Sequence, residues 1–212
     1  MPALVAGEVH VWRARVGAIP ASLELLLDAG ERARADTIAV RPRARRFART
    51  RGLLRRQLAL YTGADAAELE IVADANGKPR VRLAGGPAFN VSHSRELVLL
   101  AFTASAAVGV DVEVVRPVRD PLALARRALG ATAAQELRAL APAARERAFL
   151  RAWVLHEAQL KRSGAGLAGG RHSTTAGWRA ELPLGPRAVG ALSLARAPLR
   201  LALYDWRAPE RA

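Results

Sequence analysis

The stretch Gly109-Val110-Asp111-Val112-Glu113-Val114 decides the fold class, because valines alternate strictly with other residues along it. Alternation with a period of two is the pattern of a β-strand that buries one face. The valines therefore point into a core, and Asp111 and Glu113 project together from the opposite face. Neighbouring carboxylates repel each other unless a cation lies between them, and oxygen ligands favour a hard ion such as Mg²⁺. A solvent-exposed acidic face on an edge strand is the alternative, and the pattern alone favours it.

Segments on both sides of this strand predict an α+β protein. Helical spacing is found at residues 23–35, 41–61, 122–129, 133–140 and 145–162, and strand-like patterns at 9–14, 70–72, 80–83, 97–102, 188–194 and 199–206. Residues 89–94 form a polar segment between strands. The order strand, helices, strands occurs about twice, with a join near residues 104–108. We therefore expect an N-terminal lobe over residues 1–105 and a C-terminal lobe with the metal site over 106–212.

The composition excludes several classes of protein and requires an anionic partner. Lys+Arg number 33 and Asp+Glu 19, which gives a net charge of +14, and only two of the basic residues are lysines. Hydrophobic residues make up 51% of the chain, which excludes a disordered protein. Without cysteine there is no disulfide, thiolate metal site or cysteine nucleophile. The excess charge suits nucleic acid, a phosphorylated small molecule or an acidic protein surface.

The sequence favours a cytoplasmic protein. The N-terminus lacks the basic and apolar regions of a signal peptide. The longest apolar runs, such as residues 97–102, are much shorter than the ~20 residues of a membrane span. We therefore expect no membrane partner.

Two further segments carry polar side chains at informative spacings. Glu157 and Lys161 are four residues apart on one predicted helical face, with Trp153 one turn earlier. An ordinary surface salt bridge is the better interpretation of that pair in isolation. His93 lies between Ser92 and Ser94, which suits either a phosphate site or a simple turn.

Together, in this order and spacing, these motifs resemble the 4′-phosphopantetheinyl transferases of the larger, surfactin-synthetase-activator type. The matching elements are the basic segment 46–55, Gly77-Lys78-Pro79, residues 89–94, residues 109–113 and residues 153–161. The family signature Gly-hydrophobic-Asp-hydrophobic-Glu is intact. The second signature, Trp-x-x-Lys-Glu-Ala-x-x-Lys, differs at one position, where His156 replaces lysine.

The resemblance implies a monomer built as a pseudo-dimer of two similar α+β lobes. Each lobe has a small antiparallel sheet packed with helices, and the active site lies between the lobes. The enzyme would transfer phosphopantetheine from coenzyme A to a serine of an acidic apo carrier protein (acyl, aryl or peptidyl) and release 3′,5′-ADP. Mg²⁺, with Mn²⁺ as an alternative, would be the metal. Such carriers serve polyketide or nonribosomal peptide biosynthesis.

The resemblance also implies roles for individual residues. The metal ligands would be Asp111, Glu113 and Glu157, and the catalytic residues Glu157, Lys161 and Glu113. Coenzyme A would contact Arg46, Arg51, Arg55, Lys78, Ser92, His93 and Lys161. The proton of the carrier serine would go to Glu113, Glu157 or a water molecule on the metal. Glu136 is a weaker candidate near that serine.

Two alternatives to an active transferase stay open. A neutral His156 would remove one positive charge beside the metal site, which suggests a degraded homologue that only binds coenzyme A or a carrier. A nucleic-acid-binding protein would fit the net charge, but aromatic residues make up only 5% of the chain and do not interleave with the basic run. Residues 167–180, including Arg171, His172, Thr174 and Thr175, match no family pattern.

Overall fold

The computed structural model describes residues 3–164 and 177–208, and there the chain is α+β, as predicted. The helices are α1 (Ala29–Asp36), α2 (Arg41–Thr62), α3 (Pro121–Ala128), α4 (Ala131–Ala139) and α5 (Pro142–Ser163), with 3₁₀ helices η1 (Val16–Ala18) and η2 (Ala21–Leu26). The strands are β1 (Glu8–Arg15), β2 (Ile71–Ala73), β3 (Pro79–Val81), β4 (Ala88–Ser94), β5 (Leu97–Thr103), β6 (Gly109–Val114), β7 (Trp178–Glu181), β8 (Ala188–Leu194) and β9 (Arg200–Asp205). No helix in the described ranges has the length and apolarity needed to cross a membrane.

The strands form two main sheets and a small hairpin. The first sheet has the order β4-β5-β1-β9, the second has the order β6-β8-β7, and β2 pairs with β3. β9 runs parallel to β1, so the first sheet is mixed and the prediction of an antiparallel sheet in each lobe is wrong for it. β9 comes from the C-terminal part of the chain and completes a sheet whose other strands all precede residue 104.

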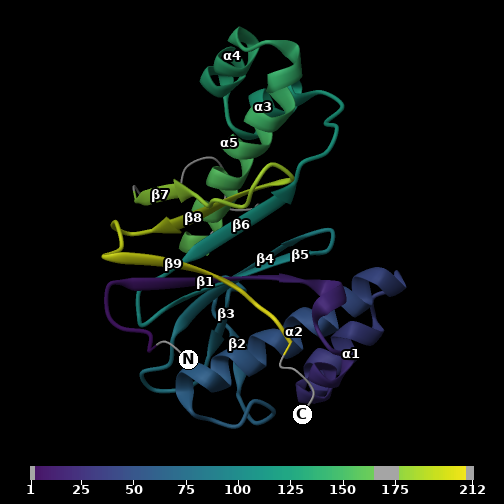
Figure 1. Cartoon of the computed structure of the whole chain (residues 1–212), viewed down its shortest axis with the longest axis vertical. Helices are drawn as coiled ribbons and strands as arrows, with labels where there is room; N and C mark the ends of the chain where they lie inside the picture. The colour runs from purple at the N-terminus through teal and green to yellow at the C-terminus, as the bar shows by residue number, and fades with distance from the viewer. Residues whose placement is uncertain (1–2, 165–176, 209–212) are drawn as a thin grey trace.

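The two sheets face each other, and a long helix covers the outer face of each (Figure 1). Side chains alternate along a strand, so each inner strand contributes to two cores. Leu99 and Ala101 of β5 pack with Val110 and Val112 of β6 between the sheets. Residues 98, 100 and 102 of β5 face α2 on the other side. Ala191 of β8 belongs to a third core with α5. The layers are therefore helix, sheet, sheet, helix.

Two local predictions are corrected by the structure. Residues 23–35 do not form one helix, because Asp28 caps a new helix and forms a capping box with Glu31. η2 ends before that point. Residues 89–94, expected as a polar segment between strands, lie in β4 and pair with β5. The turn between β4 and β5 consists of Arg95 and Glu96 alone, since Ser94 pairs with Leu97.

Arg55 of α2 is a fully buried structural residue. Its guanidinium donates to Glu31 at 2.5 Å, to Asp28, and to the carbonyl oxygens of Ala66, Ala67 and Leu69. The side chain is 0% exposed. These contacts fasten α1 and the segment after α2 to the middle of α2. Arg55, which was predicted to contact coenzyme A, thus makes structural contacts here, and its guanidinium is fully buried by protein groups.

Arg55→Met is expected to lower the free energy of unfolding by about 3–5 kcal/mol, because it leaves several buried acceptors without a donor. Urea denaturation followed by circular dichroism measures this loss. The neighbouring Arg56→Met removes the same charge from a partly exposed position and should change stability by only about 0.5 kcal/mol. Equal losses in the two variants would contradict the structural role of Arg55.

Candidate active site

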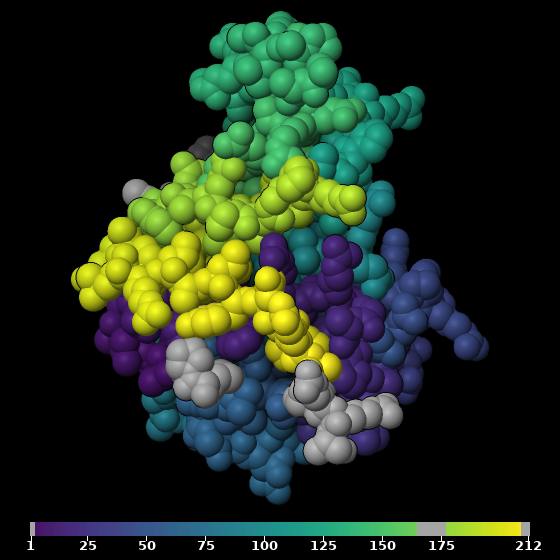
Figure 2. Space-filling view, in the orientation of Figure 1, coloured from purple at the N-terminus to yellow at the C-terminus, as the bar shows by residue number. Residues whose placement is uncertain are grey.

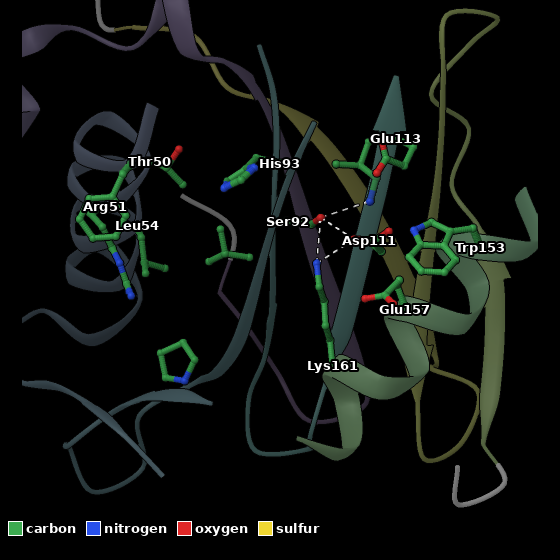
Figure 3. Close-up of a pocket in the computed structure, with 14 residues that line it drawn as sticks. Thr50, Arg51, Leu54, Ser92, His93, Asp111, Glu113, Trp153, Glu157 and Lys161 are labelled. Carbon is green, nitrogen blue, oxygen red and sulfur yellow. Dashed lines mark hydrogen bonds and ion pairs between the residues drawn. The ribbon is translucent and has the colours of Figure 1, made fainter. Parts of the chain in front are cut away.

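A pocket of about 460 Å³ lies along the edges of β4 and β6, between α2 and α5. Both strands are at the edge of their sheets. Figure 3 shows Thr50, Arg51 and Leu54 of α2 facing β4 and β6 from one side. The remaining lining residues are Phe47, Pro79, Val91, Ser92, His93, Asp111, Val112, Glu113, Trp153, Glu157 and Lys161. The pocket thus brings together residues that are more than 100 positions apart in the chain.

Side chains of β4 bind the free edge of β6. The main-chain N–H groups of Val110, Val112 and Val114 donate to the side-chain oxygens of Asn90, Ser92 and Ser94 at 2.9, 3.3 and 3.1 Å. The period of two in both strands sets this match. A buried strand edge must have its N–H groups bonded, and here side chains replace a further strand. This contact explains the alternating polar residues of β4, a segment expected to lie between strands.

The hydroxyl groups of β4 also orient the carboxylates of β6. Ser92 Oγ donates to Asp111 Oδ1 at 2.7 Å, and Ser94 Oγ donates to Glu113 Oε2 at 2.7 Å. Lys161 of α5 donates to Asp111 Oδ1 at 2.7 Å and to Ser92 Oγ at 3.0 Å (Figure 3). Asp111 is 6% exposed, so its charge is balanced by Lys161 inside the protein.

The carboxylate of Glu157 has a buried oxygen, Oε1, that makes no hydrogen bond to any residue in the described ranges. Burial raises the pKa of Glu157, and the carboxylates of Asp111 and Glu113 raise it further, against the opposing effect of Lys161. Three carboxylates that repel one another around an unpaired buried oxygen are a suitable set for a hard divalent cation. Within the described residues, however, no three acidic or histidine side chains already stand at metal-binding spacing.

The α2 side of the pocket contains residues beyond the predicted site residues. Phe47, Thr50 and Leu54 share a helical face with the predicted Arg51. Thr50 Oγ1 is buried and has no hydrogen-bond partner in the part of the chain that the structure describes. Arg51 Nε lies 3.7 Å from Glu31 Oε1, and the guanidinium lies over the ring of Phe47. Burial lowers the pKa of Arg51. The sequence does contain a signal for Thr50. It lies three residues after Phe47, so its hydroxyl group is on the same helical face as that aromatic ring, in an otherwise basic helix.

Of the three predicted phosphate contacts His93, Arg46 and Lys78, only His93 lines the pocket. His93 lines the pocket, and partial burial and the charge of Arg46 lower its pKa. Arg46 is close enough to influence His93 but is not among the lining residues; it reaches the carbonyl oxygen of Arg95 at 3.4 Å. Lys78 donates to the carbonyl oxygens of Val108 and Arg162 at 2.9 and 3.0 Å. It therefore fastens the β2–β3 turn to the ends of β6 and α5, beside the pocket.

The remaining candidates lie outside the pocket. His156 is beside Trp153 on α5, and burial and Arg179 lower its pKa, which favours the neutral imidazole. It is not a lining residue, so the replaced lysine position does not face the carboxylates directly. Glu136 is exposed on α4. Arg171, His172, Thr174 and Thr175 lie outside the described residues.

Comparisons with known proteins point to one family. The profile of the 4′-phosphopantetheinyl transferase superfamily matches residues 107–196, which include β6 and α5. The chain is 34% identical to the 4′-phosphopantetheinyl transferase HetI of Nostoc sp. over 78% of this chain and 72% of HetI. It is 31% identical to a Synechocystis sp. protein designated a candidate 4′-phosphopantetheinyl transferase, over 69% of this chain and 61% of that protein. The chain is 37% identical to 4′-phosphopantetheinyl transferase psf-1 of Bacillus pumilus, over 49% of this chain and 43% of psf-1.

Gly109→Ala is expected to separate α5 from β6. An added Cβ would lie 1.9 Å from the carbonyl oxygen of Ala158 and 2.4 Å from the amide nitrogen of Arg162. Main-chain atoms cannot move aside without shifting the helix, so we expect a loss of about 1–3 kcal/mol or more in urea denaturation. Gly17→Ala is the control, since the nearest atom there is 3.9 Å away. A Gly109→Ala variant as stable as this control would contradict the close packing.

Glu157→Gln is expected to stabilise the metal-free protein near neutral pH. A raised pKa means that the folded state binds the proton more tightly than the unfolded state, so ionisation of Glu157 costs stability. This cost is absent below the ordinary carboxyl pKa and complete above the raised pKa. In EDTA the variant should therefore melt above wild type at about pH 7.5 and lose this advantage at about pH 4. A variant that melts below wild type at the higher pH would contradict the conclusion that ionised Glu157 destabilises the metal-free fold.

Proposed function

This chain belongs to the 4′-phosphopantetheinyl transferase superfamily, a family of enzymes, and we propose that it transfers the phosphopantetheine arm of coenzyme A to a serine of an apo carrier protein. The acceptor class is an acyl, aryl or peptidyl carrier, and the second product is 3′,5′-ADP. As the family resemblance implies, we expect a monomer that acts in the cytoplasm.

The arrangement of Asp111, Glu113, Glu157 and Lys161 in one pocket carries this proposal. The two strongest family motifs, on β6 and α5, meet there through the bond from Lys161 to Asp111. A degraded homologue would not need these charges to be kept together in a partly buried site, where each costs solvation. His156, whose pKa is lowered, does not line the pocket, which supports an active enzyme over a degraded homologue.

The proposed reaction is a displacement at the β-phosphorus of coenzyme A. The serine oxygen forms a bond to that phosphorus, and the bond to the oxygen of the leaving 3′,5′-ADP breaks. The serine proton passes to Glu113 or Glu157, the two glutamates that line the pocket. Lys161, held by Asp111 and Ser92, offers its ammonium group to the phosphate charge that the leaving group acquires.

Asp111, Glu113 and Glu157 would hold a Mg²⁺ ion, and the ion would neutralise the pyrophosphate charge when bound. The unpaired Oε1 of Glu157 and its raised pKa support this donor set. Ser92 and Ser94 orient two of the three carboxylates by hydrogen bonds, as second partners of metal ligands commonly do.

The α2 side of the pocket would bind the nucleotide part of coenzyme A. Arg51 and His93 line the pocket opposite the carboxylates, and Arg46 adds positive charge beside His93. Phosphate groups bind well beside arginines, and an imidazole N–H can also donate to them. Thr50 Oγ1, which has no partner among the described residues, would hydrogen-bond to the bound ligand.

A loading assay tests the proposal. Wild type, coenzyme A, Mg²⁺ and an apo carrier protein are incubated, and intact mass spectrometry should show a gain of one phosphopantetheine on the carrier. Asp111→Asn and Lys161→Met should reduce kcat/KM by about 10²-fold or more. The exposed Glu68→Gln is the matched control and should keep wild-type activity. No gain with any of several fatty-acid, polyketide and peptidyl carriers would contradict the function.

Mg²⁺ binding can be followed without turnover. Added MgCl₂ should raise the melting temperature of wild type, because an ion that binds only the folded state stabilises it. Asp111→Asn should lose this rise, whereas Glu68→Gln should retain it. An equal rise in all three proteins would contradict the proposed ligand set.

A further inference from the structure

A second cleft, of about 580 Å³, opens at one end of the contact between the two sheets. One side is formed by the ends of β1 and β9 and by the β4–β5 turn, and the other by the end of β6 and the β7–β8 connection. In Figure 2 purple atoms of the N-terminal part of the chain reach the surface between the yellow C-terminal strand and the yellow-green β7–β8 segment.

The cleft is strongly cationic around an apolar floor. Its lining includes five arginines against two carboxylates, Glu96 and Asp205, for a net charge of +3. Arg13 is neutralised by a bidentate pair with Asp205 at 2.6 and 2.9 Å. The four other arginines have exposed side chains: Arg15, Arg95, Arg187 and Arg207. The floor consists of Ala14, Leu97, Val114, Leu184, Ala188 and Trp206.

Main-chain hydrogen bonds fix the walls of the cleft. The N–H group of Val16 donates to the carbonyl oxygen of Glu96 at 2.8 Å, and that of Trp206 donates to Arg13 at 2.8 Å. On the other wall, Val115 donates to the carbonyl oxygen of Arg187 at 2.9 Å. The backbone that carries the arginines is therefore held in place, which lowers the entropy cost of binding a partner there.

Arg95 occupies a backbone conformation that normally belongs to glycine. Its φ is +51°, and it is the only non-glycine residue with a positive φ among those the structure describes. The conformation is needed because Arg95 and Glu96 alone form the turn between β4 and β5. An arginine at this position carries strain without burying its side chain. Such strain at an exposed site indicates a use for the side chain.

We propose that this arginine cleft docks an acidic amphipathic segment of the carrier protein. Carboxylates of the segment would pair with the four exposed arginines, and its apolar face would cover the floor. The inference rests on the proposed function and adds a surface to it.

The position of the cleft suits a protein that delivers a serine to the active site. On β6, Glu113 lines the active-site pocket, and the next residue, Val114, lines the cleft. On β4, His93 lines the pocket, and Arg95, two residues later, lines the cleft. Two residues along a strand span only about 7 Å. The pocket and the cleft therefore share the ends of β4 and β6, so a carrier bound in the cleft lies against the same strands that hold the carboxylates.

The test compares charge-matched variants in steady-state loading of a carrier that wild type modifies. Arg15→Ser/Arg187→Ser removes two charges from the cleft, and Arg126→Ser/Arg127→Ser removes two exposed charges from α3. The cleft pair should raise the KM for carrier about tenfold at low salt, with kcat and the KM for coenzyme A unchanged. The α3 pair should leave all three values near those of wild type.

Arg95→Gly is the second variant, because it removes the charge and relieves the backbone strain together. It should raise the carrier KM while its melting temperature is no lower than that of wild type.

The outcomes separate this inference from the proposed function. If wild type loads no carrier, both are overturned. If wild type loads a carrier but the cleft variants keep its KM, or the α3 pair raises the KM equally, only the docking surface is overturned.

Discussion

The bond between the side chains of β4 and the free edge of β6 is the contact on which the rest of the molecule depends. Asn90, Ser92 and Ser94 supply the acceptors that the edge N–H groups of β6 require. The contact sets the register between the two sheets, and its serine hydroxyls orient the carboxylates of Asp111 and Glu113. A single row of small polar residues thus serves both the stability of the fold and the orientation of the site, so neither can change without the other.

Much of the fold follows from local patterns. The valine alternation of β6 and the helical spacings of α2 and α5 gave elements within a few residues of those observed. β4 was missed because its polar residues face another strand and not solvent or a core, so the usual link between alternation and burial does not apply. The break before α1 depends on one capping residue, Asp28, within an otherwise helical spacing. The parallel return of β9 has no local signal at all.

Site residues were predictable where spacing along one helix or strand places them on the same face. Glu157 and Lys161 share one face of α5, and both line the pocket. Spacing alone does not separate Arg51 from Arg55, which lie one turn apart on α2. Arg51 lines the pocket, whereas Arg55 is fully buried and bonded to protein groups. The partners of Arg55, Asp28 and Glu31, come from an earlier helix that the sequence could not place beside it. Lys78 likewise binds carbonyl oxygens of β6 and α5 that only the tertiary structure brings near.

The pairing of β1 with β9 has a consequence for how the protein is made. Arg13 and Asp205 are bonded across 192 positions of sequence. A nascent chain emerging from the ribosome therefore displays β1 with one edge open until almost all of the described chain has been synthesised. Open strand edges attract other chains, so this interval is when aggregation competes with folding. Slow synthesis would lengthen the exposure, and we expect chaperone demand during translation to depend on the last strand more than on any helix.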